Sequence, residues 1–413
     1  MKLDPVQHGW MSAPATRAVM RALAGDEDRS RFVGGAVRNS FLGEAVGDVD
    51  IATQFTPDEV MRRLAGAGLR AVATGVEHGT VTAIAEGKPF EVTTLRRDVK
   101  TFGRRAVVAY TTDWKEDAVR RDFTINALYA AHDGTLFDYF GGLQDIAVRR
   151  VRFIGDARQR IREDYLRILR FFRFHAWYGR GDPDSAGMAA CTEEKSGLKL
   201  LSGERVQKEL LLLLQANSPA AVLRLMQASG ILAEILQPDL RLARCEGVIA
   251  IEQANGLAPD PHLRLAALLP DSKSDAGEIA QKLRLSNEAR DRMLAAAEKD
   301  ARIIAGVSME LGRRLIYRAG PSRFIDQLLL QWGGSGAAPD DAQWRLLLAL
   351  AKQWRPAELP VSGDDVMALG VPEGPRIGVL LREIEQWWMD RNFAPTRDEL
   401  LEQLRRSVNT AGR

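Results

Sequence analysis

The segment from Arg31 to Ala52 reads RFVGGAVRNSFLGEAVGDVDIA, and it determines the expected fold of the N-terminal third of the chain. Its two ends, Arg31–Val33 and Val49–Ala52, contain β-branched and aromatic residues, whereas the glycines between them favour a turn. We therefore expect two strands. Side chains two positions apart on a strand point to the same face, so Asp48 and Asp50 should present two carboxylates together.

The same segment carries the residue types that phosphate chemistry requires. Two adjacent carboxylates repel one another unless a cation lies between them, and their oxygen ligands favour Mg²⁺. Gly34 and Gly35 have no side chains, which lets backbone N–H groups approach a phosphate, and Arg38 adds positive charge. An isolated Asp-x-Asp pair or Gly-Gly turn is more often structural. Their combination in one short segment predicts a metal-assisted site for a phosphate ligand.

The remaining sequence divides into two kinds of structure. Up to about Gly142, further runs such as Phe90–Leu95 are typical of strands. Later segments, such as Ile161–Tyr178 and Arg205–Gln215, repeat apolar residues every three or four positions and are expected to be helices. The glycine-rich residues 333–339 suggest a linker or long loop. The predicted class is α+β, with an N-terminal α/β head containing a mixed sheet, followed by an all-helical remainder.

Composition narrows the setting of the protein. The 413 residues are 46% hydrophobic and 27% charged, which is the balance of a soluble globular protein with more than one structural unit. The first residues lack the apolar core of a signal peptide, and no apolar run is long enough to span a membrane. Only two cysteines are present, so neither a disulfide framework nor a cysteine zinc site is expected. These features predict a cytoplasmic protein.

Positive charge is concentrated locally, although the net charge is only +2. One basic cluster lies within ten residues, and another extends from Arg149 to Arg173. Such clusters suit phosphate contacts, but either could be a solvated surface. The first cluster consists of Arg96, Arg97, Lys100, Arg104 and Arg105.

A second motif, RRDFTIN, covers residues 120–126. Arginine forks can hold phosphate oxygens, while a carboxylate can accept hydrogen bonds from ribose hydroxyls. Arg121 and Asp122 are therefore candidate nucleotide contacts, although such a triplet alone is more often a surface ion pair. Asn126 could contact the nucleotide or serve as a cap or turn residue.

A third motif, EDYLRILR, covers residues 163–170. At helical spacing Asp164 lies beside Arg167, and Glu163, Arg167 and Arg170 follow one stripe. Aspartate and arginine offer fixed acceptors and donors, so this face could recognise the pairing edge of a base. The alternative is an ordinary helix with surface ion pairs.

Together these motifs resemble those of the class II tRNA CCA-adding enzymes and bacterial poly(A) polymerases, a branch of the DNA polymerase beta-like nucleotidyltransferases. The resemblance covers nearly the whole chain, because further motifs follow in the family's order. These are DYFGGLQD at 138–145, SGERVQKE at 202–209, VSGDDVM at 361–367 and GPRIG at 374–378.

The resemblance implies roles for the first segment. Asp48 and Asp50 would bind two catalytic Mg²⁺ ions, while Gly35 and Arg38 would contact the triphosphate. A third carboxylate is common in the wider superfamily, and Glu91 is the candidate here. Many members have Asp where this chain has Asn39, so the geometry at the triphosphate is the point that the resemblance leaves open.

The other motifs receive roles in the same way. Arg121 and Asp122 would handle ribose and phosphate, and Asp164 with Arg167 would select C or A, with Glu163 steadying Arg167. Residues 138–145 resemble the hinge that lets the pocket switch from CTP to ATP. Residues 94–105 resemble a flexible loop used in the final A addition, in which Arg97, Lys100, Arg104 and Arg105 are candidate RNA contacts.

The function implied is template-independent addition of C, C and A to the tRNA 3′ end from CTP and ATP, by two-metal phosphoryl transfer. The implied division is a nucleotidyltransferase head at 1–145, a helical neck for base recognition at 146–215, and a body and tail at 216–413 that bind the tRNA acceptor and T arms. Neither DNA nor a membrane is an expected partner. A poly(A) polymerase, a partial CC- or A-adding enzyme and a non-catalytic RNA-binding protein are the alternatives.

Overall fold

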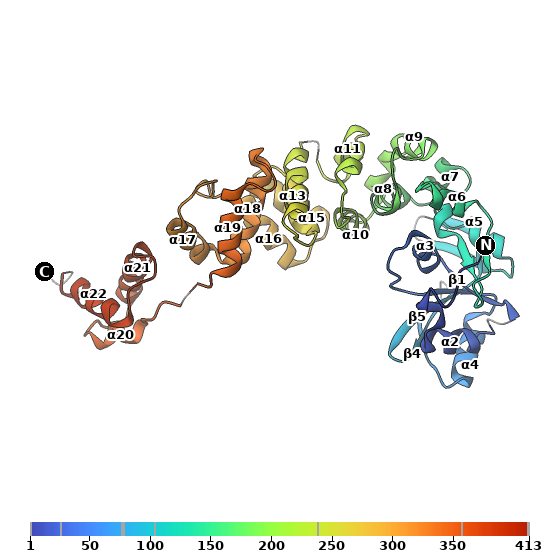
Figure 1. Cartoon of the computed structure of the whole chain (residues 1–413), viewed down its shortest axis with the longest axis horizontal. Helices are drawn as coiled ribbons and strands as arrows, with labels where there is room; N and C mark the ends of the chain where they lie inside the picture. Colours follow the sequence, from blue (N-terminus) through green and yellow to red (C-terminus); the bar gives the residue numbers. More distant parts are fainter. Residues whose placement is uncertain are drawn as a thin grey trace. The chain divides into compact units, whose positions relative to one another are not determined.

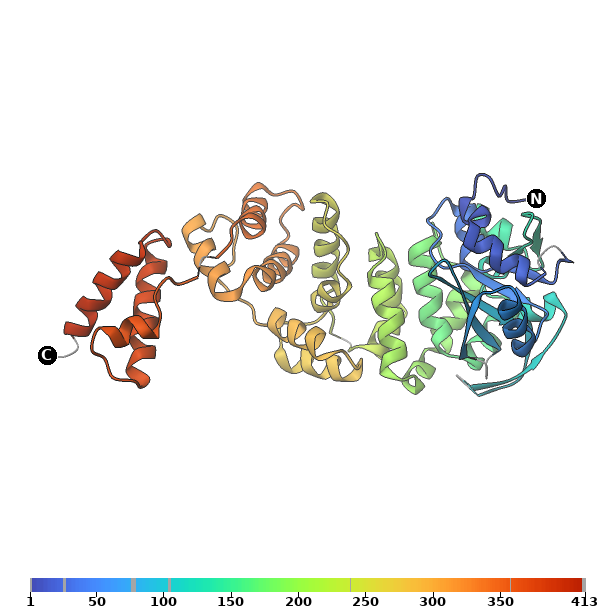
Figure 2. The ribbon, with the colours of Figure 1, turned by 90° about the horizontal axis from the view of Figure 1, so that it is seen from below.

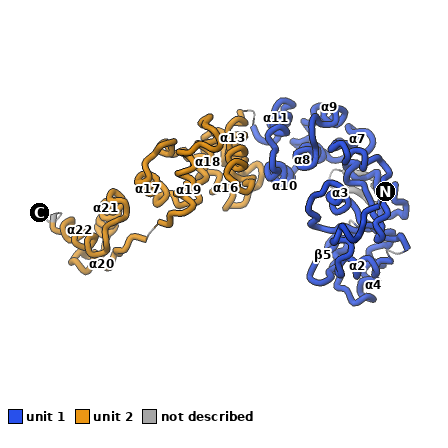
Figure 3. Tube along the Cα trace, in the orientation of Figure 1, with its two compact units in different colours: residues 1–238 blue, residues 239–413 orange. Residues whose placement is uncertain are grey.

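The computed structural model describes residues 2–24, 27–75, 79–102, 105–237, 239–356 and 358–410. The chain forms two compact units, unit 1 at residues 1–238 and unit 2 at residues 239–413 (Figure 3). Unit 1 contains the sheets, whereas the described part of unit 2 consists of helices (Figure 1). The predicted α+β class is therefore confirmed. The expected boundaries at 145 and 215 stay a prediction, because the two units reflect packing and not function.

Within the described ranges, seven strands of unit 1 form one mixed sheet in the order β3-β4-β5-β2-β1-β8-β9. Neighbouring strands are antiparallel except β2 and β5, which run parallel. Strands β6 and β7 form a separate antiparallel pair. The bounds are β1 Ser30–Val33, β2 Asp50–Thr53, β3 Arg70–Gly75, β4 Thr80–Ala85, β5 Lys88–Thr94, β6 Arg96–Phe102, β7 Arg105–Tyr110, β8 Leu128–Ala130 and β9 Leu136–Asp138.

Burial along the strands follows from their position in the sheet. All four residues of β1 are buried, because β1 lies between β2 and β8 with both faces covered. Strand β4 alternates between buried and partly exposed residues, as expected for a strand with one covered face. Helices α2 (Pro14–Ala22) and α4 (Pro57–Gly66) pack against β4 (Figure 1). A rigid sheet of this kind provides a fixed base for side chains at its strand ends.

The predicted helix at Ile161–Tyr178 is wrong in one respect, because it is two helices. Helix α7 ends at Glu163 and α8 begins at Leu166, with Asp164 in extended backbone between them. The Asp164 carboxylate accepts a hydrogen bond from the N–H of Leu166 at 3.2 Å, so a local side-chain bond competes with helix continuation. Apart from α2 and α4, the described helices of unit 1 are α1 Gly9–Ser12, α3 Gly35–Leu42, α5 Trp114–Val119, α6 Gly142–Ala147, α7 Ala157–Glu163, α8 Leu166–Tyr178, α9 Ser185–Glu193, α10 Gly203–Leu214, α11 Ala220–Ala228 and α12 Ile231–Ile235, with 3₁₀ turns η3 Thr124–Asn126 and η4 Lys195–Leu200.

The helices of unit 2 are coloured from yellow to red in Figure 2. They are α13 Leu242–Ala254, α14 Pro261–Leu268, α15 Lys273–Lys282, α16 Asn287–Ala297, α17 Met309–Ala319, α18 Pro321–Ser335, α19 Ala342–Gln353, α20 Gly363–Ala368, α21 Pro375–Asp390 and α22 Arg397–Thr410.

The prediction of a linker at residues 333–339 is wrong for its first half, since α18 continues to Ser335. The reason is a close helix contact. A Cβ added at Gly247 of α13 would lie 2.2 Å from the carbonyl oxygen of Gly333 on α18. Because these glycines have no side chains, the backbones of α13 and α18 can approach closely. In the sequence alone, the same glycines indicate a loop.

Within the described ranges, no helix combines the length and the apolar character that crossing a membrane requires.

Candidate functional site

The glycine turn after β1 forms one wall of the site. Gly34 has a φ of +71° and precedes α3, a backbone conformation that favours glycine. A Cβ at Gly34 would lie 3.7 Å from Nη1 of Arg121 and one at Gly35 would lie 3.8 Å from Nη2 of Arg38. The turn therefore places backbone without side chains beside the guanidinium groups of Arg121 and Arg38.

The expected carboxylate pair lies at the start of β2. The strand begins at Asp50, one residue later than predicted, and Asp48 precedes it. Val49 is nevertheless buried, while Asp48 is exposed and Asp50 half-buried, so the alternation that places both carboxylates on one side is retained. Asp50 pairs in register with Glu91 of β5 across the parallel strands. The structure thus places the third candidate carboxylate beside Asp50.

Electrostatics mark this cluster as a site of accumulated negative charge. The pKa of Asp50 is raised to about 6, first by burial and then by the charge of Glu91, with a further contribution from Asp48. Arg121 and Arg38 oppose this shift. A carboxylate surrounded by other carboxylates is stabilised by a bound cation. Hard oxygen donors match Mg²⁺, which commonly takes one or two carboxylates and completes its shell with water and substrate phosphates.

The described side chains agree with a Mg²⁺ site that takes some of its ligands from water and substrate phosphates. Among the described residues, no three His, Cys, Asp or Glu side chains form a group that could hold a metal ion by themselves.

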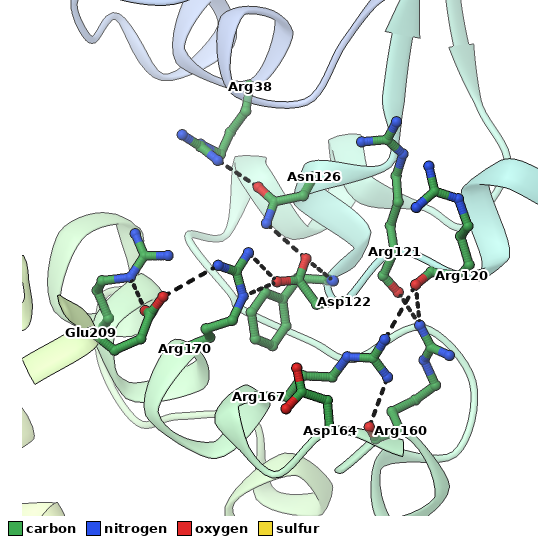
Figure 4. Close-up of polar contacts among 12 residues, drawn as sticks. Arg38, Arg120, Arg121, Asp122, Asn126, Arg160, Asp164, Arg167, Arg170 and Glu209 are labelled. Atoms are coloured by element: carbon green, nitrogen blue, oxygen red, sulfur yellow. Dashed lines mark hydrogen bonds and ion pairs between the residues drawn. The ribbon is translucent and has the colours of Figure 1, made fainter. Parts of the chain in front are cut away.

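The second motif contributes a continuous chain of polar contacts (Figure 4). Arg38 donates to Oδ1 of Asn126 at 2.5 Å, and the Asn126 amide donates to Oδ1 of Asp122 at 3.0 Å. Arg170 of α8 donates to Oδ2 of Asp122 at 2.7 Å and forms an ion pair with Glu209 of α10 at 3.5 Å. Asn126 belongs to the second motif and contacts Arg38 of the first, so it connects the two motifs. Its neighbours in the sequence did not indicate this role.

The charge state of Asp122 is fixed by these partners. Burial of the side chain opposes ionisation, but the Arg170 charge and hydrogen bonds from Asn126, Arg170 and the Phe123 N–H lower the pKa of Asp122 to about 2. Asp122 is thus a carboxylate at neutral pH.

The third motif places its polar groups on two elements. Glu163, at the end of α7, accepts a hydrogen bond from Arg167 at 2.6 Å, which is the contact expected of a residue that steadies Arg167. Arg167 also donates to the carbonyl of Arg160 at 2.7 Å. Asp164, in the break between the helices, accepts a hydrogen bond from Arg205 of α10 at 2.7 Å. Arg205 belongs to the motif at 202–209, for which the sequence suggested no contact.

One cavity of about 360 Å³ gathers residues from all three motifs. Phe174 is the lining residue that sequence analysis missed, because its place in an apolar helical pattern indicated only a core side chain. The lining residues are Gly34, Gly35, Arg38, Asp50, Arg121, Asp122, Asn126, Asp164, Arg167, Arg170 and Phe174.

In the described part of the basic segment at 94–105, Arg96 and Arg97 are not among the residues that line the cavity. Within this segment Arg96–Phe102 forms β6 and Arg105 begins β7, and the flexible loop expected at 94–105 stays a prediction. Arg97 is exposed and lies 4.0 Å from Glu116. Lys100 and Arg105 are placed on these strands by their backbones, while Arg104 lies outside the described residues.

Comparison with known proteins agrees with this arrangement. Residues 30–152 match the family model described as the poly A polymerase head domain, and residues 183–243 match that of a probable RNA and SrmB-binding site of polymerase A. A mitochondrial CCA tRNA nucleotidyltransferase 1 of Mus musculus is 34% identical, with 98% of this chain and 93% of the relative covered. The chain belongs to the CCA-adding enzyme family.

Other members of the CCA-adding enzyme family are similar over most of the chain. A CCA-adding enzyme of Levilactobacillus brevis is 30% identical over 89% of this chain and 91% of its own length. The solved structure of the Bacillus stearothermophilus CCA-adding enzyme in complex with CTP has a TM-score of 0.73 and 25% identity, covering 97% of this chain and 99% of the other. The expected family is thus confirmed over nearly the whole chain.

Proposed function

We propose that this protein adds C, C and A to the 3′ end of tRNA, using CTP and ATP and no nucleic-acid template. The observation that carries the proposal is the single cavity in which Asp50, the glycine turn, three arginines and the Asp164–Arg167 pair meet. Relatives named for CCA addition cover nearly the whole chain, and a related structure is titled as a complex with CTP. The family and the cavity therefore support the same reaction.

The first group of residues serves the phosphates. Asp48 and Asp50, with Glu91 beside them, would hold two Mg²⁺ ions, which when bound supply positive charge at the reacting phosphate and lower the pKa of the attacking hydroxyl. Arg38 and Arg121 border the glycine turn and would bind the triphosphate oxygens. Preorganised charge of this kind positions the triphosphate for attack by the RNA 3′-hydroxyl, without a covalent enzyme intermediate.

The second group binds the sugar and the base. Asp122 is ionised at neutral pH and, with Asn126, would accept hydrogen bonds from the ribose hydroxyls. Asp164 and Arg167, fixed by Arg205 and Glu163 respectively, would present an acceptor and a donor to the base. Cytosine and adenine both expose an amino group beside a ring nitrogen, so one such pair can recognise either base while uracil presents the wrong pattern.

These assignments give each of three parts of the chain a separate role. Residues 1–145 would carry the phosphate chemistry, residues 146–215 the base recognition, and residues 216–413 the contacts to the acceptor and T arms of tRNA. Such contacts would rest on RNA shape and phosphate charge more than on sequence.

An extension assay tests the proposal. Purified protein receives a tRNA that ends before CCA, together with labelled CTP and ATP and Mg²⁺, and the product is sized. Three added nucleotides in the order C, C, A are expected. A long A tail would instead identify a poly(A) polymerase. This is the second candidate, because residues 30–152 match the poly A polymerase head domain. Products shorter by one or two residues would identify a partial enzyme.

Loss of extension after replacement of both Asp48 and Asp50 by alanine is expected as well, and unchanged extension would contradict the metal-assisted mechanism.

A further inference from the structure

A buried carboxylate behind the cavity has no part in the function proposed above. Asp117 lies on α5, and only 1% of its side chain is exposed. Helix α5 is fixed at its start, where Asp113 accepts a hydrogen bond from the N–H of Lys115 at 2.7 Å and Trp114 is buried. Asp117 is not among the residues that line the cavity, so it cannot contact a nucleotide there directly.

Asp117 is shared by the two arginines of the second motif. Its Oδ1 lies 2.8 Å from Arg120, and its Oδ2 lies 3.2 Å from Arg121 and accepts the hydroxyl hydrogen of Tyr129 at 2.7 Å. The Tyr129 hydroxyl in turn accepts a hydrogen bond from Nε of Arg121 at 3.1 Å. Two buried groups thus hold one guanidinium, which fixes its plane as well as its position.

The charge of Asp117 at neutral pH is secure. Burial opposes ionisation, but Arg121, Arg120 and the Tyr129 hydrogen bond lower the pKa of Asp117 to about 2.

The other side of Arg121 faces the cavity. Its guanidinium lies next to the Gly34 turn, where an added Cβ would be 3.7 Å away, and Arg121 lines the cavity together with Asp50. A guanidinium held from behind by a carboxylate and a hydroxyl keeps free N–H groups for a ligand in front. Such a preorganised donor loses less conformational freedom when an anion binds than a mobile arginine would.

The backbone after Asp117 supports the base-recognition side as well (Figure 4). Arg160 donates to the carbonyl of Arg121 at 2.8 Å, and Arg167 donates to the carbonyl of Arg120 at 3.4 Å. On the opposite side, Oδ1 of Asp117 accepts a hydrogen bond from the N–H of Arg96 at 3.3 Å, at the start of β6. Asp117 therefore lies between the start of β6, the two arginines of the second motif and Tyr129 of β8.

We propose that Asp117 is a positioning residue for nucleotide binding, which acts by aiming Arg121 at the triphosphate. This inference rests on the proposed function for the identity of the ligand, a nucleoside triphosphate. Because the triphosphate is common to CTP and ATP, Asp117 should affect the binding of both to a similar extent.

A double-mutant cycle tests whether Asp117 acts through Arg121. Binding of CTP in the presence of Mg²⁺ is measured by calorimetry for the full-length wild type, Asp117→Asn, Arg121→Gln and the double variant. Asp117→Asn is expected to weaken CTP binding roughly tenfold, as for loss of a hydrogen bond to a charged group, and to weaken ATP binding similarly. In the Arg121→Gln background the same change should alter affinity less than about twofold.

Undiminished weakening in the Arg121→Gln background, or unchanged affinity of folded Asp117→Asn, would overturn the inference. Tyr129→Phe provides a second route if Asp117→Asn does not fold, because it keeps the buried ring and removes only the hydroxyl between Asp117 and Arg121. It should weaken CTP binding by a factor of about three, and this effect should disappear when Arg121 is glutamine.

A matched control separates positioning from stability. Glu252 forms a buried ion pair with Arg264 in unit 2, with side-chain exposures of 2% and 0%. Glu252→Gln should lower thermal stability and leave CTP affinity unchanged, and an equal loss of affinity would show that the Asp117 effect is only destabilisation. The extension assay on the wild type is read separately, so a wild type that binds CTP without adding C, C and A would refute the proposed function while the cycle still tests Asp117.

Discussion

The side-chain carbonyl of Asn39 accepts hydrogen bonds from Nε and Nη2 of Arg38, at 3.1 and 2.9 Å. The Asn39 amide donates to the carbonyl of Ala45 at 2.8 Å. Asparagine thus holds the arginine of the first motif with its oxygen and the following loop with its nitrogen. The side chain at position 39 therefore provides an acceptor for Arg38, as an aspartate there would.

The first prediction concerns that residue. Asn39→Asp should change kcat/KM for CTP by less than about threefold, because a carboxylate oxygen replaces the carbonyl and only the bond to Ala45 is lost. Asn39→Leu has a similar volume and no acceptor, and it should lower kcat/KM about tenfold. Steady-state kinetics with CTP measure both. A larger loss for Asn39→Asp than for Asn39→Leu would contradict the assigned role.

The second prediction concerns the carboxylates at the start of β2. Asp50 and Glu91 are like charges in register across two strands, and such pairs destabilise a sheet by up to about 1 kcal/mol. In EDTA, Asp50→Asn should therefore raise the melting temperature of unit 1 by about 2–4 °C while it abolishes nucleotide addition. Calorimetric melting and the extension assay measure the two effects. A lower melting temperature would show that the charge of Asp50 stabilises the metal-free fold.

The third prediction is a pH dependence. The pKa of Asp122 falls from 3.8 to about 2 on folding, so its carboxylate stabilises the fold above pH 3.8, and this stabilisation is lost as the pH falls toward 2. The full effect is about 2 kcal/mol. Urea unfolding of the wild type between pH 5 and pH 2.5 should show a fall in unfolding free energy that is shallower in Asp122→Asn. Parallel curves would exclude Asp122 as a source of the acid sensitivity.

The fourth prediction concerns base selection. Arg205 holds Asp164 at 2.7 Å, so Arg205→Gln should loosen the base acceptor, lower kcat/KM for CTP about tenfold and reduce discrimination against UTP. Arg162→Gln is the control, because the exposed Arg162 pairs with Glu194 and is not among the residues that line the cavity. Single-nucleotide addition with CTP or UTP measures the discrimination. Equal behaviour of the two variants would remove Arg205 from base recognition.

The fifth prediction concerns the close helix contact in unit 2. A Cβ at Gly247 would lie 2.2 Å from a backbone oxygen of Gly333, so Gly247→Ala should destabilise unit 2 by about 1–3 kcal/mol. Gly277→Ala is the matched change within α15, where the nearest atom would be 3.8 Å away. It should stabilise unit 2 by about 0.5–1 kcal/mol. Urea unfolding of both variants tests the difference in sign.

The fold and the candidate site could be predicted from the sequence where they depend on a short local pattern. Strands β1, β2 and β5 follow from short motifs, as do the carboxylates at Asp48 and Asp50 and most residues that line the cavity, because their spacing and chemistry are visible without the fold. The parallel pairing of β2 with β5 that places Glu91 beside Asp50 could only be suggested, since register between distant strands depends on the whole sheet.

Other features required the structure for identifiable reasons. The apolar period continues through Asp164, so nothing in the pattern shows that its carboxylate bonds to the N–H of Leu166 and that the helix ends there. Gly333 and Gly334 indicate a loop unless the facing Gly247 is known. The supporting contacts of Asp117 and Arg205 join residues on different elements, and such contacts leave no periodic signal in a single sequence.

The side-chain amide of Asn126 accepts a hydrogen bond from Arg38 through its oxygen and donates one to Asp122 through its nitrogen. Aspartate at this position would have no hydrogen to give Asp122, and leucine could satisfy neither neighbour. Asn126 therefore has two separate chemical requirements to meet, set by residues that lie 88 and 4 positions away in the chain. During evolution, a substitution at any one of these three positions would be tolerated only with compensating changes at the others, so they should be inherited as a group.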